Sequence, residues 1–279
     1  MCAVHPIADH GPPLRFAIMS MRKLWHYGQD VILPTVAFAL MLLAWELGVR
    51  AFDVPVYLLP APSVIYAETM KEIRPVMFHT WATLQTVLAG FLLSVAVSIP
   101  LGFVLASSRY ASNAIYPLLV LTQAIPKVAL APILVIALGA NELPRIAVTF
   151  LVAFFPLVIS VATGLMATPP ELIELGRSYR AGRLQEFFKI RIPFAIPFIF
   201  SGLKSAITLS VVGAVVGEFV TSDRGLGNLV QSATAFFKVP LAFGAVTLLA
   251  LMGIVLFQLV TAIERIFFPW SLRQQRDSA

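Results

Sequence analysis

Charged residues are scarce in this chain of 279 residues, where Asp, Glu, Lys and Arg together make up 12%. An ordinary soluble domain carries about a quarter. Hydrophobic residues reach 59%, and the mean hydropathy is +0.88. A soluble protein of this composition would expose too much apolar surface to water, so the sequence predicts a membrane protein.

Cysteine is almost absent, which excludes two kinds of site. The single cysteine, Cys2, cannot form an intramolecular disulfide or a thiolate metal cluster. The four histidines are scattered at positions 5, 10, 26 and 79, so we expect no metal.

Signatures of nucleotide binding and hydrolysis are also missing. No G-x-x-x-x-G-K-[ST] phosphate loop occurs, because Gly202-Leu203-Lys204-Ser205 lacks a glycine directly before its lysine. No G-x-S-x-G nucleophile elbow occurs either. We therefore expect no enzyme activity and no cofactor in this chain itself.

Long apolar runs dominate what is present. About 20 apolar residues are needed to cross a bilayer as a helix, and six segments qualify: 31–49, 80–106, 114–138, 146–167, 194–219 and 241–266. The four tryptophans, at positions 25, 45, 81 and 270, lie near predicted span ends, as interfacial residues do. The sequence predicts an all-α, polytopic fold with a tail at 1–30, a six-span domain at 31–266 and a tail at 267–279.

The basic residues predict the orientation of these spans. With the N-terminus inside, twelve Lys and Arg lie on the cytoplasmic side and six outside, while Lys127 and Lys204 lie within spans. The positive-inside rule then places both termini in the cytoplasm and the long loops 51–79 and 220–240 outside. The same rule explains the net charge of +6. No basic stripe with interleaved aromatics occurs, so we expect no nucleic-acid partner.

Three charged residues within or at the ends of spans are candidates for a solute pathway. Lys127 lies between Pro126 and Pro132, which favour a broken helix there, and it either attracts an anion or serves a structural role. Lys204 and Glu218 are about 21 Å apart along one helix, too far to pair. They either mark the two ends of a pathway, or Glu218 binds the loop 221–227.

A stripe of small residues runs along the fifth predicted span, comprising Gly202, Ala206, Ser210, Gly213 and Gly217. Small residues at this spacing share one helix face and allow close packing. The stripe packs against another helix of this chain or against a second copy.

The loop 168–192 is long, charged and compatible with helix, and it falls on the cytoplasmic side. Thr168 is a candidate N-cap, followed by Pro169 and Pro170. Gly182 divides the loop into two short helices. From these features alone the loop is either a docking helix for a soluble partner or an amphipathic helix on lipid headgroups.

The spacing in this loop resembles a known family motif. Glu174-Leu175-Gly176, three residues, Arg180, nine residues and Ile190-Arg191-Ile192-Pro193 are similar to the "EAA" loop of binding-protein-dependent ABC importer permeases. Four further segments resemble the nitrate/sulfonate/taurine-type subfamily: 59–63 (LPAPS), 125–132 (IPKVALAP), 217–219 (GEF) and 224–227 (RGLG). The resemblance covers most of the chain, roughly from residue 59 to 270.

The resemblance implies the type I importer fold in a bacterial inner membrane. It also implies a separate ATPase dimer that binds ATP and grips the loop, an extracytoplasmic binding protein that delivers a small solute, and, for a single six-span chain, a second copy. The solute is expected to be anionic or a pyrimidine vitamin precursor. The expected coupling site comprises Glu171, Leu172, Ile173, Glu174, Leu175, Gly176, Arg177, Tyr179, Arg180, Ala181, Gly182 and Pro193.

Two residues depart from the family pattern. Arg180 replaces the glycine whose left-handed backbone joins the two short helices, and Gly182 could supply that turn instead. Gly176 replaces the second alanine of the triplet. An ion-coupled secondary transporter, with Lys127 and Glu218 in the ion path, is the alternative function. An intramembrane enzyme would need paired catalytic groups on facing spans, which the sequence does not show.

Overall fold

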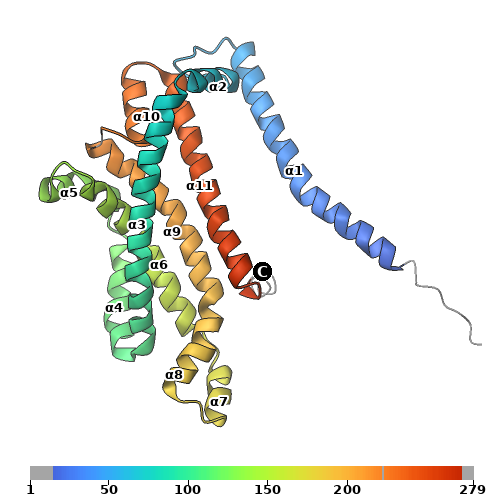
Figure 1. The fold of residues 1–279 in the computed structure, drawn as a ribbon, viewed down its shortest axis with the longest axis vertical. Coiled ribbons are helices and arrows are strands. Elements are labelled where there is room, and N and C mark those ends of the chain that lie inside the picture. Colours follow the sequence, from blue (N-terminus) through green and yellow to red (C-terminus); the bar gives the residue numbers. More distant parts are fainter. Residues whose placement is uncertain (1–14, 222, 272–279) are drawn as a thin grey trace, which may run out of the picture. The chain divides into compact units, whose positions relative to one another are not determined.

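The computed structural model describes residues 15–221 and 223–271, and every regular element in these ranges is a helix (Figure 1). The predicted all-α fold is therefore confirmed. By its internal contacts the chain divides into two units, residues 1–64 and 65–279, which we describe separately. Residues 1–14, including Cys2, and 272–279 lie outside the described ranges.

The first unit contains one long helix, α1 (Arg15–Ala51), whose part from Ile32 to Ala51 is apolar enough to cross a membrane. Its start at Arg15 makes part of the predicted tail helical. After a turn, α2 (Pro62–Lys71) begins within the LPAPS segment. Glu46 Oε2 accepts from Ser63 N at 3.0 Å, and Glu46 Oε1 accepts from Ser63 Oγ at 2.7 Å. A carboxylate here satisfies a free N–H group at the start of α2.

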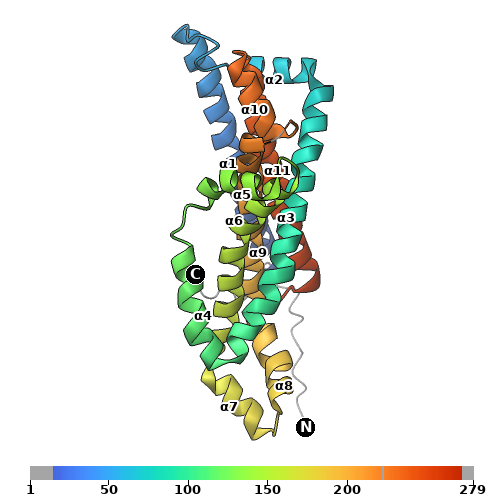
Figure 2. The ribbon, with the colours of Figure 1, turned by 90° about the vertical axis from the view of Figure 1, so that its left-hand side faces the viewer.

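Three long helices lie side by side at the centre of the second unit (Figures 1 and 2): α3 (Ile73–Ser107), α6 (Leu143–Met166) and α9 (Ile192–Thr221). Ser94 Oγ and Ser98 Oγ on α3 donate to Phe150 O and Phe154 O on α6, both at 3.1 Å. Such bonds between helices are possible only where small residues allow close approach.

Two further helices complete this part of the unit, α10 (Leu226–Ala235) and α11 (Val239–Phe267). Both pack against α9 through one apolar cluster that includes Val211, Leu226 and Ala245. The sequence predicted α11, whereas α10 was expected to be loop. α10 lies at the opposite end of the unit from the helices of the loop 168–192 (Figure 1).

The third predicted span is broken, as its prolines predicted. α4 (Arg109–Thr122) is followed by a short 3₁₀ helix, η1 (Lys127–Leu130), and by α5 (Ala131–Leu138), and the two arms are bent by 82°. The break falls just before Lys127, and Pro132 lies in the first turn of α5. In the described residues five helices are long and apolar enough to cross a membrane, or six if this bent pair is one span.

The predicted loop helices are present as α7 (Pro170–Ser178) and α8 (Arg183–Glu186), and a π-helix, η2 (Phe187–Arg191), joins α8 to α9. The prediction that Thr168 caps α7 is wrong. Pro169 is the N-cap residue, and Thr168 Oγ instead donates to Leu165 O in the last turn of α6 at 3.2 Å.

Candidate coupling loop and pathway residues

The turn between α7 and α8 is made by Arg180, whose φ is +57°. Ala181 N donates to Gly176 O at 3.0 Å, and Arg180 N donates to Arg177 O at 2.8 Å. These are the two bonds of a Schellman motif, which ends a helix on a left-handed residue. The suggestion that Gly182 supplies this turn is wrong, because Gly182 is extended, with φ −70° and ψ 162°. The family geometry is thus compatible with a non-glycine residue at this position.

Gly176 is the point of closest contact between α7 and the π-helix. A Cβ atom on Gly176 would lie 2.5 Å from Ile190 Cδ1, the end of a flexible side chain. An alanine here, as in the family triplet, needs only a small shift of Ile190. The absence of a side chain lets the two segments pack directly.

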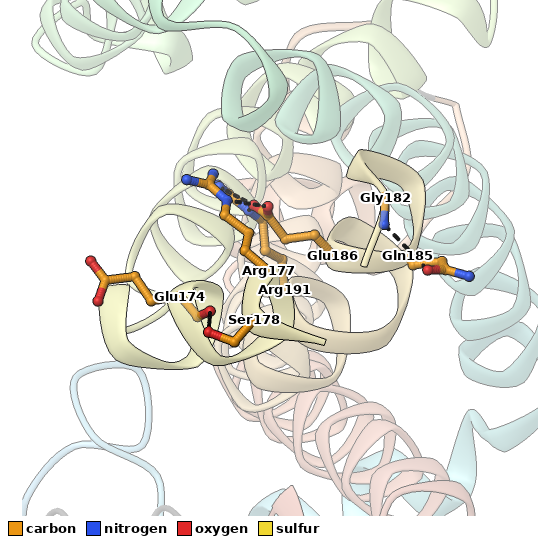
Figure 3. Close-up of polar contacts among 7 residues, drawn as sticks. All are labelled: Glu174, Arg177, Ser178, Gly182, Gln185, Glu186 and Arg191. Atoms are coloured by element: carbon orange, nitrogen blue, oxygen red, sulfur yellow. Dashed lines mark hydrogen bonds and ion pairs between the residues drawn. The ribbon is translucent and has the colours of Figure 1, made fainter. Parts of the chain in front are cut away.

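An ion-pair cluster at Glu186 holds the two halves of the loop together (Figure 3). Glu186 Oε1 accepts from Arg191 Nη2 at 2.8 Å and from Arg191 Nε at 3.1 Å, and Glu186 Oε2 accepts from Arg177 Nε at 3.3 Å. The Glu186 side chain is only 9% exposed. We call Arg177, Glu186 and Arg191 the loop clamp. Because Arg191 immediately precedes α9, the clamp joins α7 to the start of α9.

Glu186 and Arg191 were not among the site residues predicted from the sequence. The sequence does hold one signal for Glu186: it is the only acidic residue between Glu174 and the next span, in a segment with five basic residues. A lone carboxylate among that many cations is a good candidate for a central ion-pair partner.

The outer face of α7 is apolar and uncovered in the described structure. Leu172, Leu175 and Tyr179 are 40%, 54% and 82% exposed. With Ile190 and Phe194 they line a groove of about 420 Å³. Glu171 and Glu174 are also exposed on α7, and Glu174 lines a second cavity on the other side of the helix. An exposed apolar face on a charged loop marks a surface that contacts a protein partner or lipid.

Arg177, Arg180 and Gly182 are exposed as well, whereas three other predicted coupling residues are not. Ile173, Ala181 and Pro193 are half-buried. The second cavity, of about 550 Å³, lies between α7 and the turn joining α3 to α4, with Ile173, Glu174 and Arg177 among its lining residues. The structure therefore brings the predicted coupling residues together on one compact loop.

The three candidate pathway residues are not brought together. Lys127 Nζ donates to Gln123 O at 3.3 Å and lies 5.0 Å from the centre of the Phe155 ring. Lys204 Nζ pairs with Glu264 Oε2 on α11 at 2.5 Å, and Glu264 is fully buried. The contact of Lys127 with Phe155 and the ion pair of Lys204 with Glu264 both join helices of the same chain, as a structural role requires.

Glu218 binds the start of α10. Its Oε2 accepts from Gly227 N at 2.7 Å. From α3, His79 Nδ1 accepts from Gly225 N at 3.0 Å and Thr83 Oγ1 accepts from Leu226 N at 2.7 Å. Three side chains thus satisfy three N–H groups that a helix start leaves free. The interpretation of Glu218 as a partner of the loop 221–227 is confirmed.

The small-residue stripe packs α9 against α6 within the chain. Cβ atoms added to Gly213 and Gly217 would lie 2.8 Å from the Cα atoms of Thr149 and Arg145. One on Gly202 would lie 2.6 Å from Ser160 Cβ. Ala206 and Ser210 are fully buried. Of the two interpretations, packing within the chain is confirmed, and α6 already covers the stripe.

Comparisons with known proteins agree with this geometry. Residues 98–272 match the family model described as "binding-protein-dependent transport system inner membrane component". The chain is 34% identical to the formylaminopyrimidine transport permease protein ThiX of Halalkalibacterium halodurans, over 86% of this chain and 96% of the relative. It is 35% identical to the riboflavin transport system permease protein RibX of Chloroflexus aurantiacus, over 90% and 94%.

A solved structure is similar in fold. The MetNI methionine ABC transporter, in an inward-facing conformation, contains a chain that matches with a TM-score of 0.53 at 19% identity, over 69% of this chain and 98% of that one. This similarity supports the fold, and the family model and the relatives supply the function. The resemblance seen in the EAA-type loop is confirmed: the chain belongs to the binding-protein-dependent inner membrane component family and is a permease subunit of an ABC importer.

Proposed function

We propose that the loop of α7, α8 and η2 is the site at which a separate ATPase dimer drives this permease. In this proposal both termini and the loop face the cytoplasm of a bacterium, across its inner membrane. A binding protein delivers the solute at the opposite end, near α10, and a second copy of the chain completes the pathway. The ATPase subunits supply all ATP binding, so the permease needs no cofactor of its own.

One observation carries the proposal: the exposed apolar face of α7 is attached rigidly to α9. The Schellman turn, the close contact of Gly176 with Ile190 and the loop clamp leave α7 little freedom to move alone. A partner that binds Leu172, Leu175 and Tyr179 as a helix in a groove would move α7 and α9 together.

The alternatives fit the contacts less well. An amphipathic helix resting on lipid headgroups needs no attachment to a transmembrane helix. An ion-coupled transporter with Lys127 and Glu218 in its ion path needs their charges to face that path. Glu218 is instead 1% exposed and bonded to Gly227, and Lys127 lies over Phe155.

The solute is proposed to be small and polar. Relatives of this chain are named for formylaminopyrimidine, riboflavin, nitrate and aliphatic sulfonates. Among these we favour a small anion or a pyrimidine, because the polar pocket lined by Gln85, Thr86 and Arg145 has a volume of about 240 Å³.

The substitution Glu174→Arg tests the coupling site. Glu174 is exposed on α7, the helix that carries the proposed docking face, so reversing its charge should lower solute uptake about tenfold, the effect of about 1.4 kcal/mol of lost docking energy. Uptake would be measured in liposomes that contain the permease, its ATPase and its binding protein, with expression of the permease checked.

The matched control is Glu68→Arg, which makes the same charge change on α2. Its exposed contact with Lys71 contributes little, so uptake should be unchanged. Full uptake by the Glu174→Arg transporter would contradict the coupling role.

A further inference from the structure

We propose that a polar pocket between α3 and α6 is a solute-contact site that binds a small oxyanion, such as a nitrate, sulfonate or carboxylate group. This inference rests on the proposed function. The pocket has a volume of about 240 Å³ and is lined by Gln85 and Thr86 of α3, by Arg145 at the start of α6, and by Glu142 and Arg224 beside it. It lies at the end of α6 opposite the coupling loop, where the binding protein is expected to deliver the solute.

Arg145 is the main reason for this assignment. It lies in the first turn of α6, at the end of an apolar span, and is only 4% exposed. Ionisable residues in membrane-spanning helices commonly mark solute pathways. Its backbone is fixed in place, because Gly217 of α9 packs directly against Arg145 Cα. This packing fixes the point at which the Arg145 side chain leaves α6, at this wall of the pocket.

The charges around the pocket favour an anion. Arg145 Nη1 donates to Arg224 O at 3.4 Å, and Arg145 Nη2 lies 3.5 Å from Glu142 Oε1. The Arg224 side chain also pairs with Glu142. The lining thus holds two guanidinium groups and one carboxylate. Glu218 is near Arg145 but is not part of the lining, and its Oε2 accepts from Gly227 N.

The chemistry of the lining selects the class of ligand. A guanidinium group donates two parallel N–H bonds to an oxyanion at about 2.7–2.9 Å, and Arg145 and Arg224 both line the pocket. Gln85 is an exposed amide on α3 and supplies a further donor. Thr86 Oγ1 donates to Ala82 O at 3.2 Å and can still accept a bond.

The size of the pocket limits the ligand. At about 30 Å³ per water, 240 Å³ holds about eight water molecules. Nitrate or a short alkanesulfonate fits in this space, whereas a flavin does not. The pocket therefore favours the small anions among the solutes named for the relatives over riboflavin.

The test measures binding to the full-length chain purified in detergent, without its partners. Sodium nitrate and sodium methanesulfonate should raise its melting temperature in a saturable way, beyond sodium chloride at equal ionic strength. Arg145→Lys keeps the charge but loses the two-bond geometry. Gln85→Leu removes an amide that makes no hydrogen bond within residues 15–221 and 223–271. Each should weaken apparent binding about tenfold. Arg74→Gln, which removes an exposed positive charge from the same end of α3, should change nothing.

Several outcomes would overturn the proposal. These are an absence of any saturable effect in the wild-type chain, an equal effect of chloride, or unchanged binding in the Gln85→Leu chain. Stabilisation by a neutral aminopyrimidine but not by the two oxyanions would also overturn it. Because no ATPase is present in this experiment, its result is independent of the Glu174→Arg uptake test, and either proposal can fail alone.

Discussion

At the scale of single residues, Arg180 shows that backbone conformation matters more than residue type in the coupling loop. A residue with a Cβ atom pays about 1–2 kcal/mol for a left-handed conformation, which glycine does not. The Schellman bonds of Ala181 and Arg180 nevertheless form with good geometry. The rest of the loop therefore stabilises a turn that its own central residue disfavours.

Replacing Arg180 by glycine should consequently stabilise the end of α7. We expect the free energy of opening this turn to rise by about 1 kcal/mol. The amide hydrogens of residue 180 and Ala181 should then exchange about fivefold more slowly. Arg180→Ala is the control, since it removes the charge but keeps the Cβ atom and should give no gain. Equal protection in both variants would show that the charge, and not the backbone, is what matters.

The single residues that the sequence could not predict are those whose roles depend on distant partners. Glu186 was overlooked because Arg177 and Arg191 approach it only when α7 folds back on η2. Lys204 was considered for a pathway because Glu264 lies far along the chain and meets it only through the packing of α9 on α11. Local patterns such as Pro126 before a break, by contrast, gave correct predictions.

At the scale of elements, the loop clamp decides which transmembrane helix moves with α7. On the α6 side, the connection consists of a short turn in which Thr168 bonds back to Leu165. On the α9 side, the clamp and the contact of Gly176 with Ile190 hold α7 directly. Movement of α7 should therefore reach α9 before it reaches α6.

The substitution Glu186→Gln tests this order. It removes the carboxylate charge, so Arg177 and Arg191 lose their ion pairs and one amide oxygen is left as their acceptor. α7 should therefore loosen from α9. We expect ATP hydrolysis by the assembled transporter to persist while solute uptake per ATP falls about threefold or more. Measuring phosphate release and uptake in the same liposomes gives this ratio.

A second substitution sharpens the result. Once Glu186 is neutral, Arg191→Met should add little, because both changes remove the same contact and their effects are not additive. If the ratio of uptake to hydrolysis in the Glu186→Gln transporter equals that of the wild type, the clamp does not transmit the movement.

Helices that form because a hydrophobic segment is long enough were predicted well. Helices that form only through contacts with other helices were predicted poorly. The spans predicted at 194–219 and 241–266 correspond to α9 and α11 within two residues at each end. α10 was treated as loop, because its start depends on His79, Thr83 and Glu218, which lie on other helices. A ten-residue helix held by such caps has no strong signature of its own.

At the scale of the whole molecule, one chain should not transport by itself. In the proposed function, a separate ATPase supplies the energy for transport, and this chain supplies only the pathway. We expect liposomes that contain only this chain to show no uptake of labelled solute when a sodium or proton gradient is imposed. Liposomes with all partners and internal ATP are the positive control. Uptake driven by a gradient without ATP would contradict the importer assignment.

In the proposed dimer, a second copy would use a surface other than the small-residue stripe, since α6 already covers it. α5 offers an apolar surface, because Ile133 and Ile136 on it are 61% and 86% exposed. The face that appeared most suitable from the sequence is thus used inside the chain, because the sequence cannot show which neighbour fills a stripe.

The pair of Lys204 and Glu264 has a consequence for how the protein is made. Glu264 follows Lys204 by 60 positions in the chain, so at about 5–20 residues per second it leaves the ribosome about 3–12 s later. Until then Lys204 has no counter-charge, and leaving it alone in lipid is costly. The cell's insertion machinery should therefore retain α9 until α11 has been synthesised, and release the two helices into the bilayer as a neutralised pair.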